Sequence, residues 1–110
     1  MSMTINLYYT GKDSAARRFA EEMERSGTAA AIRAEDGNLR YEYFLPLSDP
    51  ETVLLIDAWR DQEALDRHHA SPAMAKIAAL REKHGLRMRA ERFIADPGGM
   101  TEHDERFIRR

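Results

Sequence analysis

Four stretches of the chain are predicted to be β-strands, three of them because apolar and polar residues alternate along much of their length. The first stretch is residues 4–10 (TINLYYT), the second is 38–45 and the fourth is 86–94. The third, residues 53–59 (VLLIDAW), is apolar almost throughout and therefore predicts a strand that is covered on both faces.

Apolar residues at helical spacing predict helices between these strands. Asp13 or Ser14 is placed to cap a first helix, which a break at residues 26–27 separates from a short second piece. Asp61 is well placed as the N-cap of a helix that follows the third strand. Residues 71–72, Ser-Pro, then restart a helix that leads to the fourth strand.

The predicted order is strand, helix, strand, strand, helix, strand. This is the split βαβ order of a ferredoxin-like α+β domain, with an antiparallel sheet, both helices on one face, and the second and third strands paired across a turn. The strands carry apolar residues on both sides, so the other face needs a cover, which a homodimer would supply. We expect the domain to span residues 1–96, with residues 97–110 either a frayed tail or an arm that packs on a partner subunit.

Composition limits the classes of partner. The 110 residues include 17 Lys and Arg against 19 Asp and Glu, a net charge of −2, which argues against binding to nucleic acid or an anionic membrane. Cysteine is absent, which excludes disulfides and thiolate chemistry and fits a reducing compartment. The first residues do not resemble a signal peptide, and no apolar run approaches membrane-spanning length, so we expect a cytoplasmic protein.

Residues 52–71 are the stretch best suited to carry chemistry. An apolar strand ends there in the only tryptophan, Trp59, and leads into a helix that bears histidines. Asp57 is a carboxylate within the covered strand, so it must be hydrogen-bonded or paired. Arg89 or Arg92 of the fourth strand is the candidate partner.

His68 and His69 are adjacent, so on a helix they point in different directions and cannot both bind one ion. The four histidines also lack zinc spacing, and we predict no metal site. Spacing leaves open which of the two faces inward, and a structural role is the alternative to proton transfer for either. Asn6 is unusual within a strand, so it lies either at an edge or in a pocket. Strand tyrosines are candidates for an aromatic pocket wall, or pack in the core: Tyr8, Tyr9, Tyr41 and Tyr43.

Two motifs are similar to those of a known family. Residues 35–41 (EDGNLRY) have the form acid-x-Gly-x-Leu-x-Tyr at the start of the second strand, and residues 57–59 (DAW) have the form acid-x-Trp at the end of the third. A helix with His68 follows, and then a Ser-Pro step. Over roughly residues 4–94, the chain thereby resembles the antibiotic biosynthesis monooxygenase (ABM) superfamily, and most closely its small proteins assigned as quinol monooxygenases.

The resemblance implies a dimeric α+β barrel with a pocket between helices and sheet in each subunit. Members of the superfamily include oxygenases that use neither metal nor flavin and act on quinols or polycyclic phenols, relatives that bind and degrade haem, and others that sense ligands. Asn6, Trp59 and His68 match positions that line this pocket. Asp57 stands where a glutamate is usual, and Ala73 stands where a histidine is often found.

A cofactor-free oxygenase must stabilise its substrate as a phenolate, because the anion gives up an electron to dioxygen more easily than the neutral phenol does. This leads to the hypothesis of a monooxygenase for a quinol or another aromatic hydroxyl compound. In it His68 takes the proton, Asn6 donates to the oxyanion, and Trp59 stacks on the ring. The residues that contact the substrate are Asp57, His69, Tyr8, Tyr41 and Tyr43. Two alternatives stay open: a haem-binding enzyme with His68 or His69 as axial ligand, and a non-catalytic dimer that binds a small hydrophobic molecule.

Overall fold

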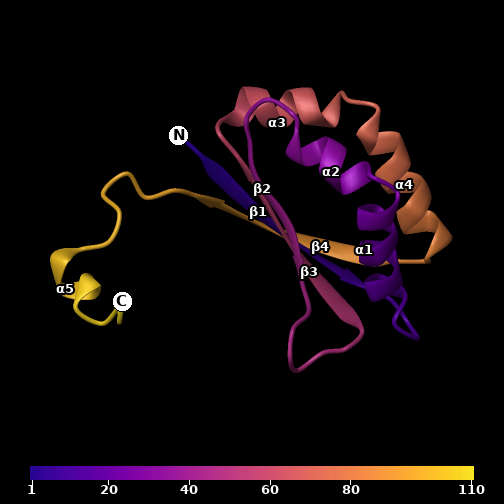
Figure 1. The fold of residues 1–110 in the computed structure, drawn as a ribbon, viewed down its shortest axis with the longest axis horizontal. Helices are drawn as coiled ribbons and strands as arrows, with labels where there is room; N and C mark the ends of the chain where they lie inside the picture. Colours follow the sequence, from indigo (N-terminus) through magenta and orange to yellow (C-terminus); the bar gives the residue numbers. More distant parts are fainter.

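The computed structural model describes all 110 residues and shows an α+β fold built on a single sheet (Figure 1). The strands are β1 (Met3–Thr10), β2 (Asn38–Phe44), β3 (Thr52–Trp59) and β4 (Arg87–Ile94). The helices are α1 (Ala15–Arg25), α2 (Thr28–Arg33), α3 (Gln62–His69), α4 (Ala73–Lys83) and α5 (Glu102–Glu105). None of these helices is long and apolar enough to cross a membrane.

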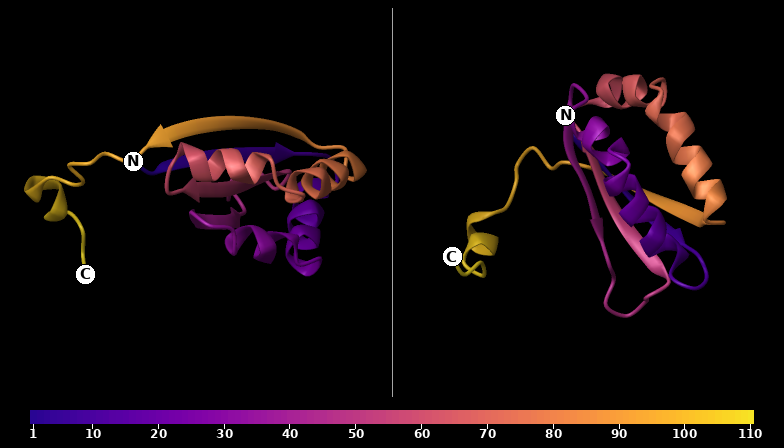
Figure 2. Two further views of the ribbon diagram at one scale, coloured as in Figure 1. Left: turned by 90° about the horizontal axis from the view of Figure 1, so that it is seen from above. Right: turned by 45° about the vertical axis from the view of Figure 1, so that its right-hand side comes forward.

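The strands form one antiparallel sheet in the order β2-β3-β1-β4. Helices α1 to α4 all lie along the same face of this sheet (Figures 1 and 2). The predicted ferredoxin-like α+β fold is confirmed, and so is the antiparallel pairing of the second and third strands. We call the helix-covered face the inner face and the opposite one the outer face.

Local sequence explains where two of the helices begin. Asp61 caps α3 as predicted, since its Oδ1 accepts a hydrogen bond of 2.8 Å from the backbone N–H of Ala64. The predicted break before α2 falls at Gly27, whose φ of 82° is easy only for glycine. The side-chain cap predicted for α1 is wrong: Ser14 has a left-handed φ of 63° instead of the usual extended geometry, and makes no capping hydrogen bond.

The hydrophobic core fills the space between the inner face and the helices. Its largest fully buried side chains are Trp59, Phe19, Met23, Ile32, Leu55, Leu65 and Val53. Aromatic contacts continue from the sheet to α1, where the ring centroids of Tyr9 and Phe19 are 4.8 Å apart. The core therefore positions the end of β3 firmly against α3.

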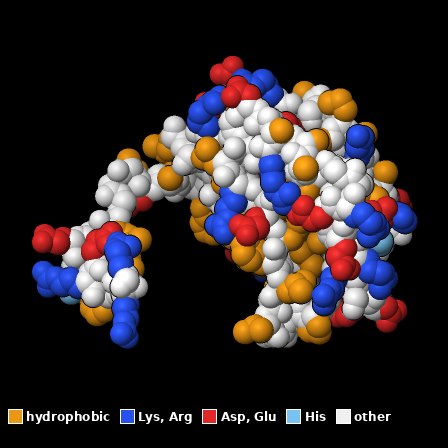
Figure 3. Space-filling model, viewed as in Figure 1, with side chains coloured by type: hydrophobic (Ala, Val, Ile, Leu, Met, Phe, Trp, Pro, Cys, Tyr) orange, Lys and Arg blue, Asp and Glu red, His pale blue; other side chains and the backbone are white.

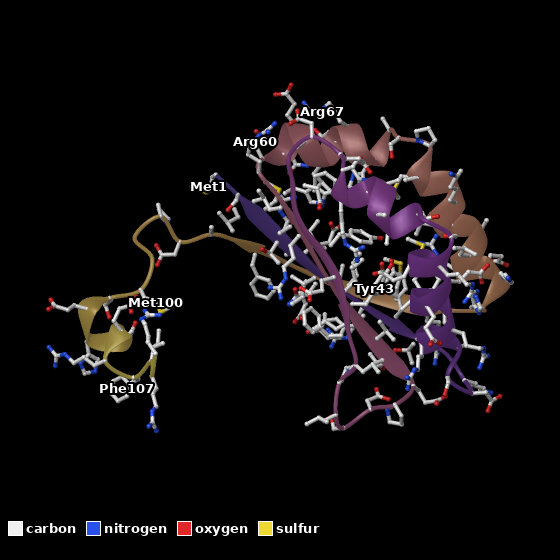
Figure 4. The ribbon with its side chains drawn as sticks, in the orientation of Figure 1. Met1, Tyr43, Arg60, Arg67, Met100 and Phe107 are labelled. Atoms are coloured by element: carbon white, nitrogen blue, oxygen red, sulfur yellow. The ribbon has the colours of Figure 1, made fainter.

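The outer face mixes apolar and charged side chains without any cover from the helices. Strand alternation places Asn6, Tyr8, Leu54 and Ile56 there, and the guanidinium of Arg89 lies 3.8 Å from the Tyr8 ring centroid. Beyond β4, residues 97–110 form an arm that stands apart from the body (Figure 3). Its side chains Met100 and Phe107 are exposed, Phe107 to 78% (Figure 4).

Candidate active site

A cavity of about 250 Å³ lies between the inner face of the sheet and helices α3 and α4. We call it the Asp57 cavity. Most of its wall is apolar, and six side chains bring polar groups to it: Tyr9, Tyr41, Asp57, His68, His69 and Arg81. Pockets of several hundred Å³ hold drug-sized ligands, so this volume suits a compact molecule of one or two rings.

Asp57 lies on β3 with its side chain turned toward the helices and only 4% exposed. Its Oδ1 accepts a hydrogen bond of 2.7 Å from the indole Nε1 of Trp59, and no protein group donates to Oδ2. Burial raises the pKa of this carboxyl to about 6, although the neighbouring His68 and the Trp59 hydrogen bond both act to lower it. Asp57 can therefore gain or lose a proton near neutral pH.

The predicted arginine partner of Asp57 is wrong. Arg92 donates to the Met3 sulfur and to Gln62 Oε1, while Arg89 lies over the Tyr8 ring on the outer face. Strand alternation turns Arg89 away from Asp57, and Arg92 is used at the end of the sheet. The partner of Asp57 is instead Trp59, two residues further along the same strand.

His68 is 3% exposed and stacks on Trp59, with ring centroids 4.7 Å apart and an interplanar angle of 28°. Its Nδ1 lies 3.0 Å from Glu35 Oε2 and 3.1 Å from Oε1. Because a carboxylate only accepts, the hydrogen-bond network assigns the proton of neutral His68 to Nδ1. Nε2 then has a free lone pair and no protein partner, so His68 has the arrangement of an oriented base.

Glu35 reaches His68 because the turn after α2 is pressed against α3. Gly37 has a φ of 86°, and a Cβ there would lie 2.5 Å from the Ala64 Cβ, so only glycine fits. The backbone N–H of Arg60 donates to the Gly37 carbonyl at 2.8 Å. Arg60 and Arg67 both hold the Asp36 carboxylate, and they lie together at this end of the molecule (Figure 4). The acid-x-Gly motif thus supplies Glu35, the carboxylate partner of His68.

Three of the four tyrosines lie on the inner face, two of them in the cavity wall, and the fourth lies on the outer face. Tyr41 and Tyr9 line the cavity, and burial raises the pKa of Tyr9 to about 12 and that of Tyr41 well above its ordinary value. Tyr43 lies one step further out, between β2 and α1, where its hydroxyl donates to that of Tyr41 at 3.4 Å (Figure 4). Tyr8 is on the outer face.

The structure does not bring Asn6 to this cavity. Its neighbour Ile5 pairs with Asp57 and lines the cavity, so alternation along β1 turns Asn6 to the outer face, opposite Ile56 and Glu91. The predicted meeting of Asn6 with Trp59 and His68 is therefore not met within one chain. His69, in contrast, lines the cavity beside His68, with ring centroids 5.8 Å apart.

Sequence reasoning missed two polar residues of the site. Glu35 was part of a motif but had no assigned role, and its spacing of two residues before an obligatory glycine is the signal that points to it. Arg81 had no predicted role, yet it lines the cavity. No group of three or more His, Asp or Glu side chains is arranged to hold a metal ion.

Residues 2–80 match the family model of antibiotic biosynthesis monooxygenases. The chain belongs to this family. No protein of curated function matches its sequence.

Solved structures share the fold of this family member. SnoaB, a cofactor-independent oxygenase from Streptomyces nogalater, has a TM-score of 0.72 at 20% identity, covering 86% of this chain and 93% of SnoaB. A candidate antibiotic biosynthesis monooxygenase from Deinococcus radiodurans gives 0.73 at 21% identity, over 87% and 93%. A conserved protein from Methanosarcina mazei gives 0.73 at 17% identity, over 84% and 91%. Identities this low show a shared fold only, so the chemistry of this chain has to be argued from its own cavity.

Proposed function

We propose that this ABM family member is a cofactor-independent monooxygenase that acts on a quinol or another aromatic hydroxyl compound in the Asp57 cavity. The observation that carries the proposal is the state of His68. Glu35 holds Nδ1, and Nε2 is left without a protein partner beside a mostly apolar cavity. The description of SnoaB as a cofactor-independent oxygenase gives independent support.

The proposed reaction balances without an external reductant. The substrate gains one oxygen atom at a ring carbon and loses two hydrogen atoms, which leave with the second oxygen atom as water. All the electrons that dioxygen takes up come from the substrate. The first requirement is removal of the hydroxyl proton, because a phenolate passes an electron to dioxygen more easily than a phenol does.

Each polar residue of the cavity has a role in this proposal. His68 Nε2 takes the hydroxyl proton, and Glu35 positions the ring and balances the charge of the imidazolium. The Tyr9 hydroxyl stays protonated, because burial raises its pKa to about 12, so it can donate to the phenolate oxygen in place of Asn6. Trp59 forms the platform under His68 and fixes the Asp57 carboxyl.

The proposed enzyme is a homodimer in which the outer faces cover each other. Leu54, Ile56 and Phe93 lie on this face, and Phe93 is 51% exposed in the single chain. The arm of residues 97–110 is proposed to pack on the partner subunit through Phe107. A two-fold axis through the outer face leaves the Asp57 cavity of each chain on the far side of its sheet.

The test compares oxygen uptake with 1,4-naphthalenediol as substrate in the wild type, His68→Gln and His103→Gln, after subtracting uptake without protein. General-base catalysis contributes roughly 100-fold or more, so His68→Gln should lower kcat/KM by at least that factor. His103 lies on the exposed arm and receives the same substitution, so its variant should match the wild type. Equal losses in both variants, or none in His68→Gln, would remove His68 as the base. A Soret shift on adding haem that disappears in His68→Gln would favour the haem-binding alternative.

A further inference from the structure

The cavity contains one cation that the proposed proton transfer does not use. Arg81 of α4 lines the Asp57 cavity and is only partly exposed. Its one side-chain hydrogen bond goes from Nη1 to the Met88 sulfur at 3.2 Å, and thioether sulfur is a weak acceptor. It forms no ion pair within the chain, whereas Arg33, Arg60 and Arg67 each bind a carboxylate.

Arg81 and Asp57 belong to different ends of the cavity. Met88, which Arg81 contacts, pairs with Tyr9, whereas Asp57 pairs with Ile5. These positions are four residues apart along β1, about 13 Å of strand. Burial raises the pKa of Tyr9, while the charge of Arg81 acts to lower it and that of Asp57 to raise it, so both groups lie within electrostatic reach of the Tyr9 hydroxyl. The cavity therefore has a proton-accepting end and a cationic end.

We propose that the substrate is an aromatic hydroxy acid whose carboxylate binds Arg81 while its hydroxyl faces His68 and Asp57. A guanidinium matches the planar carboxylate with two parallel hydrogen bonds, which are stronger than neutral ones. The apolar wall between the two ends, which includes Leu7, Ile77 and Ala90, suits the flat ring that joins the two groups. Arg81 is the one Lys or Arg side chain that lines the cavity, so a single carboxylate matches its charge better than a dianion such as a phosphate does.

This inference rests on the proposed function for its choice of ring, but it can be tested without turnover. The probes are 5,8-dihydroxy-2-naphthoate, whose carboxylate lies on the ring away from the hydroxyls, and its carboxamide, which has the same shape without the charge. Trp59 is the only tryptophan and lies beside the cavity, so its fluorescence reports binding under nitrogen. Oxygen uptake with the same two compounds then gives kcat/KM.

The wild type should bind the carboxylate roughly 10- to 100-fold more tightly than the carboxamide. In Arg81→Met, which keeps the length of the side chain but not its charge, the ratio of the two Kd values should fall close to one. Arg81→Lys should recover part of the preference. Arg25→Met removes the same charge from an exposed position at the end of α1 and should keep the wild-type ratio.

The outcomes separate the two proposals. A wild type that binds both probes equally, or an Arg81→Met variant that keeps the full preference, overturns the inference about Arg81. A clear preference in binding without oxygen uptake supports Arg81 as the carboxylate site and contradicts the monooxygenase proposal. Oxygen uptake on both probes with no preference does the reverse.

Discussion

The two faces of the sheet are built from the same strands and are unusual in opposite ways. On the inner face, ionisable groups are buried: Asp57 and His68 lie in a mostly apolar surrounding. On the outer face, apolar side chains such as Ile56 and Leu54 lie among charged ones with no helix above them. Neither arrangement is what folding of a single chain alone would favour.

The contrast shows how to separate function from assembly in one small domain. A buried carboxyl with a raised pKa reduces stability at neutral pH, and this supports the proposal that the inner face carries the chemistry. An uncovered apolar surface indicates a missing partner, and this is why we propose a second copy on the outer face. Substitutions on the two faces should therefore affect different measurements.

The largest effect is expected on the outer face. Burying an isoleucine side chain contributes about 1.5–3 kcal/mol, and a two-fold axis counts it in both subunits, so Ile56→Lys should weaken dimer association by about 3–6 kcal/mol. Light scattering at micromolar concentration should show a dimer for the wild type and a monomer for the variant. Leu47→Lys, at a fully exposed position of the β2–β3 loop, is the control that should stay dimeric. A monomeric wild type would contradict the assignment of the outer face.

The next effect is on the inner face and concerns folding rather than assembly. Trp59 is fully buried, and removing its ring in Trp59→Ala should lower the free energy of unfolding by about 3–5 kcal/mol in urea titration. Trp59→Phe keeps most of the volume but loses the hydrogen bond to Asp57, so its loss should be smaller. A loss below about 1 kcal/mol in Trp59→Ala would show that Trp59 is not a structural platform.

Asp57→Asn should instead stabilise the protein at alkaline pH. The folded-state pKa of about 6 lies above the ordinary aspartate value of 3.8, so the folded state holds the proton more tightly and wild-type stability falls as pH rises through this range. The variant avoids that loss and should gain up to about 3 kcal/mol at pH 8, with no gain at pH 3. Urea titrations at both pH values measure the difference.

Asp61 supplies a control of opposite sign for this pH dependence. The backbone N–H of Ala64 lowers the pKa of Asp61, so its carboxylate stabilises the fold above its unfolded pKa, and that contribution disappears on acidification. Asp61→Asn should therefore be less stable than the wild type at pH 8 and approach it at acid pH. A gain in Asp57→Asn that does not change with pH would mean that the carboxyl is not buried in the charged state.

Local patterns were enough to predict the fold. The period-two alternation of residues 4–10 and 38–45 matches β1 and β2 within one residue at each end, because these strands each have one buried face. Asp61 marks a helix start through its side-chain carboxylate, and Gly27 marks one through its left-handed backbone. Ser14 did not cap α1, since its left-handed backbone depends on the loop around it and not on its own residue type.

The predicted catalytic residues lie together only where they are close in sequence. Trp59 and His68 flank one strand-to-helix turn, and their rings stack in the structure. Glu35 meets His68 across 33 residues, and Arg81 reaches the cavity from another helix, so both depend on packing that no local pattern encodes. The orientation of Asn6 depended on one further fact, the register that places Ile5 opposite Asp57.

Asn6 therefore gives the smallest expected effect and the sharpest check on the division between the faces. Asn6→Ala changes a side chain on the outer face, so kcat/KM should stay within about twofold of the wild type and stability within about 0.5 kcal/mol. Oxygen uptake tests this at a concentration where the dimer is intact, with His68→Gln measured beside it as the variant with a large loss.

If Asn6→Ala lost activity as strongly as His68→Gln, the reaction would take place at the outer face, with both subunits contributing. The Asp57 cavity would then be no more than a packing defect. If only His68→Gln loses activity, the inner face carries the chemistry. Asn6 then matches a pocket residue of the family only in its position along the strand, because its side chain lies on the opposite face of the sheet.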